Sequence, residues 1–223
     1  MELEARRRVS YDGPMSQDTT NQTIHLTIEL LDMPYPIMRR IGISEAATLA
    51  DLHRVIQIAM PFTNSHLHQF DVPAPMSKGS RKRPLITRYG TPDPDGWMDV
   101  EDENDTKLRD LVAKGVKSFI YIYDFGDNWE HAITIDATDP TTSEQGFAHL
   151  VEAQGRAPPD DCGGAPGFEA FVDAMTNAKH EDHADLANWY GQKTFNPANV
   201  PTKSIQAQLA KIKPKPKRKS PNK

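Results

Sequence analysis

Sulfur chemistry is nearly absent from this sequence. Cys162 is the single cysteine among 223 residues, so the chain cannot form an internal disulfide. A zinc site built on thiolates needs several cysteines and is excluded for the same reason. So few cysteines are typical of a reducing compartment, and we expect a cytoplasmic protein.

The sequence also lacks segments that direct a protein into or across a membrane. Its beginning, MELEARRRVSYDG, contains no apolar stretch of the kind found in secretory signals. No run approaches the roughly 18 apolar residues of a transmembrane helix, so we expect no membrane partner. Translation could start at Met1 or at Met15, and both starts stay open.

Sequence motifs of the common enzyme classes are missing. The chain contains no P-loop and no GxGxxG, GxSxG, HExxH or CxxC pattern. This argues against the nucleotide-binding, hydrolase and redox classes that these motifs define. We therefore favour a non-enzymatic protein and leave the enzyme question open.

Charge is unevenly distributed along the chain. The net charge is −5, but residues 211–223 hold seven Lys or Arg and no acid, which leaves −12 on the rest. An acidic body disfavours a phosphate backbone, whereas the tail can neutralise phosphates without reading base sequence. A solubilising or ribosome-binding tail is the alternative. The residues expected to contact nucleic acid nonspecifically are Lys213, Lys215, Lys217, Arg218 and Lys219.

The hydrophobic pattern predicts an α+β fold with a mixed or antiparallel sheet. Alternating apolar residues predict a strand at 24–31 and its hairpin partner at 37–43, and a capping box at Thr48 predicts a helix to about Met60. This order resembles the start of a β-grasp fold. Further strands are expected at 66–72, 118–124 and 129–135, and helices at 106–114, 167–178, 182–190 and 203–212.

The remaining segments are assigned by composition. Residues 74–105 are expected to form a long polar excursion, and 143–154 favours a helix. The later helices are expected to pack on the sheet. We divide the chain into a disordered extension (1–21), a folded domain (22–200) and a short helix with a disordered basic tail (201–223).

Three polar segments flank predicted core strands and form the candidate site. They are NSHLH (64–68), DFGDNWEH (124–131) and PPDDCGG (158–164). On a strand, two histidines two residues apart would face the same way. The residues of the predicted polar cleft are His66, His68, Asp124, Asp127, His131, Asp160, Asp161 and Cys162.

Two interpretations of these side chains stay open. Imidazoles with carboxylates suit zinc, iron or manganese, and the candidate ligands are His66, His68, His131 and Asp127. Alternatively, the histidines are core residues that hydrogen-bond to carboxylates. Cys162 beside a histidine could be a nucleophile, but neighbouring carboxylates disfavour its thiolate. We predict no cofactor, with a transition metal as the alternative, and we expect Arg39 and Arg40 to be solvated.

Several motifs together resemble the plasmid pRiA4b ORF-3-like family. The resemblance rests on IMRR, LADLH, SHLHQF, YIYDFGDNW with His131, PPDDCGG, WYG and FNP, and it covers about residues 22–200. Met38, Pro61-Phe62 and Asp160 depart from the family pattern. The resemblance implies a strand at 148–153 in place of the helix, and an uncharacterised family found on plasmids and mobile elements.

Our leading hypothesis is a non-enzymatic binding module with a polar groove. Some relatives carry a resolvase label, but no nucleophilic serine lies among arginines in this sequence. The alternative is a metal-dependent hydrolase or nuclease that uses the same His and Asp residues.

Overall fold

The computed structural model of the chain describes residues 22–76, 79, 83–92, 99–139 and 146–215. The predicted extension 1–21 and tail residues Lys217, Arg218 and Lys219 lie outside these ranges. The strands are β1 (Thr23–Leu30), β2 (Ile37–Ser44), β3 (His68–Pro73), β4 (Ile86–Gly90), β5 (Glu101–Asp102), β6 (Ser118–Tyr123), β7 (Trp129–Asp139) and β8 (Ala148–Gln154). The helices are α1 (Leu49–Ala59), α2 (Leu108–Ala113), α3 (Gly164–Thr176), α4 (His183–Tyr190) and α5 (Thr202–Leu209).

All eight described strands form one sheet, in the order β5-β4-β3-β6-β7-β1-β2-β8. Neighbouring strands are antiparallel except for the parallel pair β4–β5. The sheet is therefore mixed, and together with the helices it confirms the predicted α+β class.

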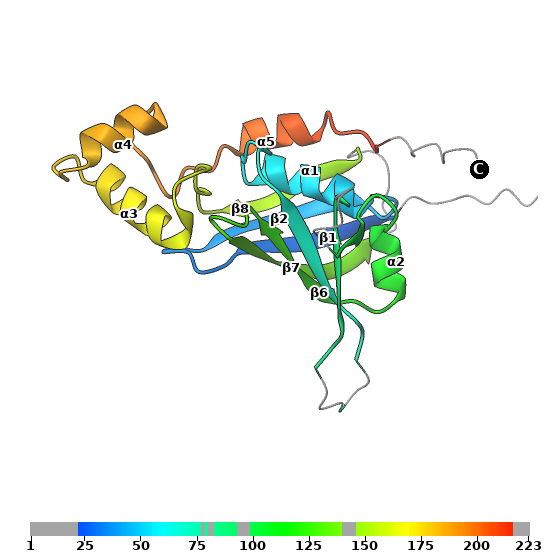
Figure 1. Cartoon of the computed structure of the whole chain (residues 1–223). Helices are drawn as coiled ribbons and strands as arrows, with labels where there is room; N and C mark the ends of the chain where they lie inside the picture. Colours follow the sequence, from blue (N-terminus) through cyan, green and yellow to red (C-terminus); the bar gives the residue numbers. More distant parts are fainter. Residues whose placement is uncertain (1–21, 77–78, 80–82, 93–98, 140–145, 216–223) are drawn as a thin grey trace, which may run out of the picture.

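The hairpin and first helix follow directly from the sequence pattern. Alternate residues of β1 are buried, from Ile24 to Leu30. Thr48 caps α1, and Asp51 completes the capping box. The buried residues Leu52 and Ile56 of α1 belong to the same core as the inner face of β1, and α1 lies over the sheet in Figure 1. The β-grasp-like start is confirmed.

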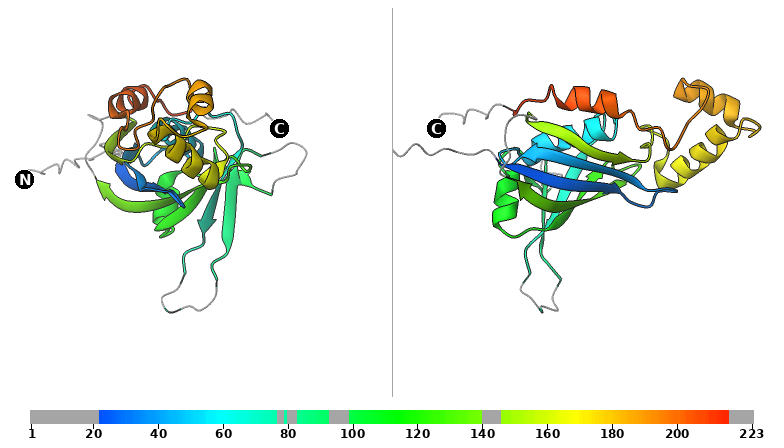
Figure 2. Two further views of the ribbon diagram at one scale, coloured as in Figure 1. Left: turned by 90° about the vertical axis from the view of Figure 1, so that its left-hand side faces the viewer. Right: turned by 180° about the vertical axis from the view of Figure 1, so that it is seen from behind.

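The later helices occupy two places. Helix α5 packs against α1 and β8, with Ile205 and Leu209 almost fully buried. Helices α3 and α4 extend beyond one end of the strands, and α2 lies toward the opposite end (Figures 1 and 2). This placement puts the start of α3 beside the loops that leave the sheet at that end.

Two element predictions were incomplete or wrong. The helix predicted at 143–154 is wrong, because 148–154 forms β8 and pairs with β2 from Met38 to Ile43. Although the composition of this segment favours a helix, backbone pairing with the edge of β2 makes it a strand. The polar excursion 74–105 contains β4 and β5, which are only five and two residues long and so lack a long alternating apolar pattern.

Candidate functional site

Three loops meet at the end of the sheet nearest α3. They are the 61–67 segment between α1 and β3, the 124–128 turn between β6 and β7, and the 155–163 segment between β8 and α3. Because β3 and β6 are neighbours, the first two loops lie side by side, and the Asp124 amide donates to the Leu67 carbonyl at 2.9 Å.

The third loop is fixed against the other two. The Thr63 amide donates to Asp160 Oδ2 at 2.7 Å, and the Thr63 hydroxyl donates to the same oxygen. On the other side, the Gly163 amide donates to Asp127 Oδ2 at 3.2 Å. Gly164 has a φ of +67°, and a Cβ there would lie 2.6 Å from the Asp127 carbonyl oxygen. This close approach and positive φ require glycine.

His66, Asp124 and Asp161, one from each loop, converge on a single point. Their ligand atoms all lie within 4.8 Å of one another. His66 Nε2 is 3.0 Å from Asp161 Oδ1 and 3.5 Å from Asp124 Oδ2. This nitrogen is buried and makes no hydrogen bond within the described part of the chain. The three groups therefore gather around a common position, and His66 Nε2 is not aligned for a hydrogen bond with either carboxylate.

The carboxylate of Asp124 is held in place by its own turn. Its Oδ1 accepts the Gly126 amide at 2.9 Å, which leaves Oδ2 facing His66. The Asn128 amide donates to the Asp124 carbonyl at 2.6 Å. Asp124, Asn128 and Asp161 all have φ between 54° and 60°, a left-handed conformation that Asp and Asn tolerate best. The local sequence DFGDN thus explains the geometry of the carboxylate.

His68 does not join this cluster. Strand β3 begins only at His68, so the period of a strand does not relate it to His66. The His68 Nε2 lies 2.7 Å from Glu103 Oε2, and its ring stacks on His53 with centroids 3.5 Å apart. The expectation that His66 and His68 face the same way is therefore wrong.

His131 also lies apart from the cluster, inside the core. It is fully buried against Phe62 and Tyr121, and its Nδ1 donates to the Trp129 carbonyl at 3.0 Å. Burial lowers the pKa of His131 to about 4, so the ring is neutral. We correct the prediction that His131 shares the cluster of His66 and Asp161, because its side chain points into the apolar interior.

The thiol of Cys162 is not suited to nucleophilic attack. Burial raises the pKa of Cys162 to about 12, and the charges of Asp127, Asp160 and Asp161 act in the same direction. The neutral thiol predominates at physiological pH, as the neighbouring carboxylates suggested.

Sequence inspection missed a closed ring of hydrogen bonds behind the 61–67 loop. His53 Nε2 donates to Asn64 Oδ1 at 2.6 Å, and the Tyr121 hydroxyl donates to His53 Nδ1 at 2.8 Å. Gln57 donates to the Tyr121 hydroxyl at 3.0 Å and accepts the Asn64 amide at 2.9 Å. Every donor has an acceptor only if His53 is neutral. The ring fixes Asn64, two residues before His66.

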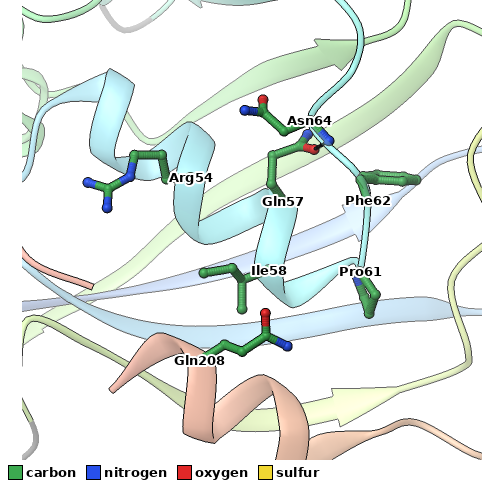
Figure 3. Close-up of a pocket in the computed structure, with 7 residues that line it drawn as sticks. All are labelled: Arg54, Gln57, Ile58, Pro61, Phe62, Asn64 and Gln208. Atoms are coloured by element: carbon green, nitrogen blue, oxygen red, sulfur yellow. Dashed lines mark hydrogen bonds between the residues drawn. The ribbon is translucent and has the colours of Figure 1, made fainter. Parts of the chain in front are cut away.

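The two amides of this ring also line a surface hollow of about 400 Å³. It lies between α1, the loop that follows α1, and α5, and its wall includes Arg54, Phe62 and Gln208 (Figure 3). None of the predicted site residues lines it.

The described start of the tail lies against α1. Arg54 donates to the Lys213 carbonyl at 3.0 Å, and the Lys215 amide donates to Asp51 at 3.1 Å.

Within the described ranges, no helix is both long and apolar enough to span a bilayer.

Comparisons with known proteins agree with the motifs. The family model of the plasmid pRiA4b ORF-3-like protein matches residues 22–204. The uncharacterized protein y4hQ of Sinorhizobium fredii is 35% identical over 177 residues, which make up 78% of this chain and 84% of that protein. The crystal structure of a protein of unknown function from Methanosarcina mazei Go1 matches with a TM-score of 0.72 and 27% identity, and covers 83% of this chain and 98% of that one. The chain therefore belongs to the plasmid pRiA4b ORF-3-like family.

Proposed function

We propose that this chain is a binding module that holds a divalent transition-metal ion between His66, Asp124 and Asp161. The observation that carries the proposal is the convergence of one imidazole and two carboxylates on one point. Imidazole and carboxylate ligands together suit zinc, manganese or iron.

The distances between the three groups favour an ion over direct pairing. Two ligand atoms that each lie about 2 Å from a tetrahedral ion are about 3.3 Å apart. The His66 separations of 3.0 and 3.5 Å lie on either side of this value. An ordinary histidine–carboxylate contact would also align a donor with an acceptor, and His66 Nε2 has no such alignment.

Access from solvent favours a second candidate function at the same site. The Asp161 side chain is 67% exposed, so an ion held there would keep coordination positions open to water. A bound metal lowers the pKa of such a water and can make it a nucleophile. Metal-dependent hydrolysis is therefore the alternative, and it predicts turnover of a phosphodiester or ester substrate that stops in the His66→Ala variant.

Metal titration tests the proposal. Isothermal titration of the full chain with Zn²⁺ and Mn²⁺ is expected to show one site, which His66→Ala and Asp161→Asn weaken by at least about tenfold, because each removes one of three ligands. His180→Ala is the matched control, since His180 is equally exposed and has carboxylates of Asp173 and Asp182 at 3.7 and 3.8 Å. Equal affinity in the wild type and in His66→Ala would refute the site.

We further propose that the basic tail contacts nucleic-acid phosphates without sequence preference. The support is its charge, with four Lys or Arg and no acid in residues 216–223. Each neutralised phosphate releases counterions, so retention on DNA should fall steeply with salt. Deletion of 216–223 removes no described residue and four of the tail's seven basic residues, and should strongly weaken retention at low salt; unchanged retention would contradict the proposal.

A further inference from the structure

An apolar pocket opens directly beside the proposed metal site. It has a volume of about 260 Å³ and lies between α3, α4 and the loop before α3. The residues that line it are Asp161, Cys162, Gly167, Ala170, Phe171, Leu186 and Trp189. Asp161 belongs to both features, so a molecule in the pocket would lie next to an ion held by that carboxylate.

The lining of this pocket is suited to a flat apolar group. Phe171 and Trp189 meet edge to face with centroids 5.9 Å apart, and Phe171 is buried. Trp189 is 48% exposed, and Leu67 and Phe125, which follow the ligands His66 and Asp124 in sequence, are also exposed. Large aromatic surface left in water favours ligand binding, because covering it is favourable.

The negative charge around the site limits which polar group a ligand in this pocket can present to the ion. Four aspartates lie on the two loops around the site, at positions 124, 127, 160 and 161. Within the described ranges, no Lys or Arg forms an ion pair with any of them. A divalent ion offsets only two of these four charges, so a singly charged head group is favoured over a phosphate dianion.

We infer that the pocket and the metal together bind a monocarboxylate that carries an aromatic or branched apolar group. The carboxylate completes the coordination of the ion beside Asp161, and the apolar group enters the pocket against Phe171 and Trp189. This inference rests on the proposed metal site and names the class of ligand that the site takes. The carboxylate can belong to a free acid or to the C-terminal residue of a peptide.

Calorimetry with chosen probes tests this inference. In the presence of saturating Zn²⁺, we expect 3-phenylpropionate to bind at least about tenfold more tightly than propionate or 3-phenylpropionamide, because each control lacks one of the two recognised groups. Without metal this preference should disappear. A second arm compares Gly-Gly-Phe with its C-terminal amide. Whichever carboxylate probe binds more tightly identifies a free acid or a peptide end as the source.

Two variants separate the possible failures. Trp189→Ala should weaken binding of the better probe by about tenfold and leave Zn²⁺ affinity unchanged, whereas Val151→Ala, a substitution at a similarly exposed apolar residue on β8, should alter neither. If Zn²⁺ binds but neither carboxylate probe binds, or if Trp189→Ala has no effect, the inference is overturned and the metal site survives. If Zn²⁺ does not bind at His66, both are overturned.

Discussion

At the scale of single residues, Arg39 is a charged side chain that the sequence predicts to be solvated but that the fold buries. Two adjacent arginines predict a solvated strand end, yet Arg39 is fully buried. Its guanidinium donates to the carbonyls of Ala59, Gln154 and Gly155 at 2.8–3.0 Å. The Ala59 carbonyl is at the C-terminal end of α1, where a positive charge is favourable. Arg39 thus joins α1 to β2 and to the end of β8.

Replacing Arg39 should therefore cost stability. Arg39→Met removes the donor of one buried hydrogen bond, to Ala59, and of two partly buried ones, to Gln154 and Gly155. We expect the free energy of unfolding to fall by about 2–4 kcal/mol. Arg40→Met is the matched control, because Arg40 forms a half-exposed ion pair with Asp136 at 3.4 Å and should contribute under about 1 kcal/mol. Urea denaturation measures both. Similar losses in the two variants would show that Arg39 has no special role.

Residue identity alone could predict that the candidate site contains carboxylates and an imidazole, but not which of the histidines belongs to it. The DFGDN and PPDDCGG motifs pointed to Asp124 and Asp161, because clustered acids and glycines rarely form ordinary strands or helices. Whether a nearby histidine points toward those acids depends on where a strand begins, and a shift of one residue reverses the side chain. His66 lies before β3, and His131 lies inside β7 facing the core. The residues next to each histidine in sequence do not show which of the two faces the carboxylates.

At the scale of elements, the hydrogen-bonded ring around His53 fastens α1 to β6 and to the loop that carries His66. Burial lowers the pKa of His53 from 6.5 to about 3, with the charge of His68 acting in the same direction. Between pH 6.5 and about 3, His53 is therefore neutral in the folded chain and protonated in the unfolded chain. Stability from this group is present above pH 6.5 and is lost as the pH falls toward 3.

Acid should accordingly destabilise the protein through this ring. Between pH 6.5 and 5 we expect a loss of about 2 kcal/mol from His53, measured by urea unfolding at each pH. His53→Gln should flatten the pH dependence by this amount. An identical slope in wild type and His53→Gln would contradict the assignment of a neutral ring.

The contact between the third loop and the β6–β7 turn is also testable. Gly164→Ala forces a Cβ to within 2.6 Å of the Asp127 carbonyl oxygen at a φ of +67°, whereas at Gly191, with φ +72°, a Cβ meets nothing within 4 Å. We expect Gly164→Ala to weaken Zn²⁺ binding markedly, because it displaces Asp161, and to cost about 1–3 kcal/mol of stability. Gly191→Ala carries the strain of the positive φ without the clash and should keep full Zn²⁺ affinity.

Sequence patterns predicted the elements with strong periodicity and failed where tertiary pairing decides. The β1–β2 hairpin, α1 and the β6–β7 pair have regular apolar spacing or a clear cap, and each forms as expected. The segment 148–154 becomes a strand because β2 offers it an edge, and β4 and β5 are too short to show a periodic apolar pattern. Such elements depend on contacts between residues far apart in the chain.

At the scale of the whole molecule, the sheet brings together three loops that are separated by up to a hundred residues. The 61–67 and 124–128 loops are neighbours because β3 pairs with β6. The third loop reaches them because β8, although at the far edge of the sheet, leads back into α3 at the same end (Figure 2). The described start of the tail follows α5 and lies against α1, where Lys213 and Lys215 contact Arg54 and Asp51.

The most direct test of the metal site is a crystal structure of the full chain grown with Zn²⁺, with diffraction recorded at the zinc absorption edge. We predict an anomalous peak bonded to His66 Nε2 and to carboxylate oxygens of Asp124 and Asp161, at about 2 Å from each. Absence of a peak at this point, or zinc bound only at a surface pair such as His180 and Asp173, would contradict the account.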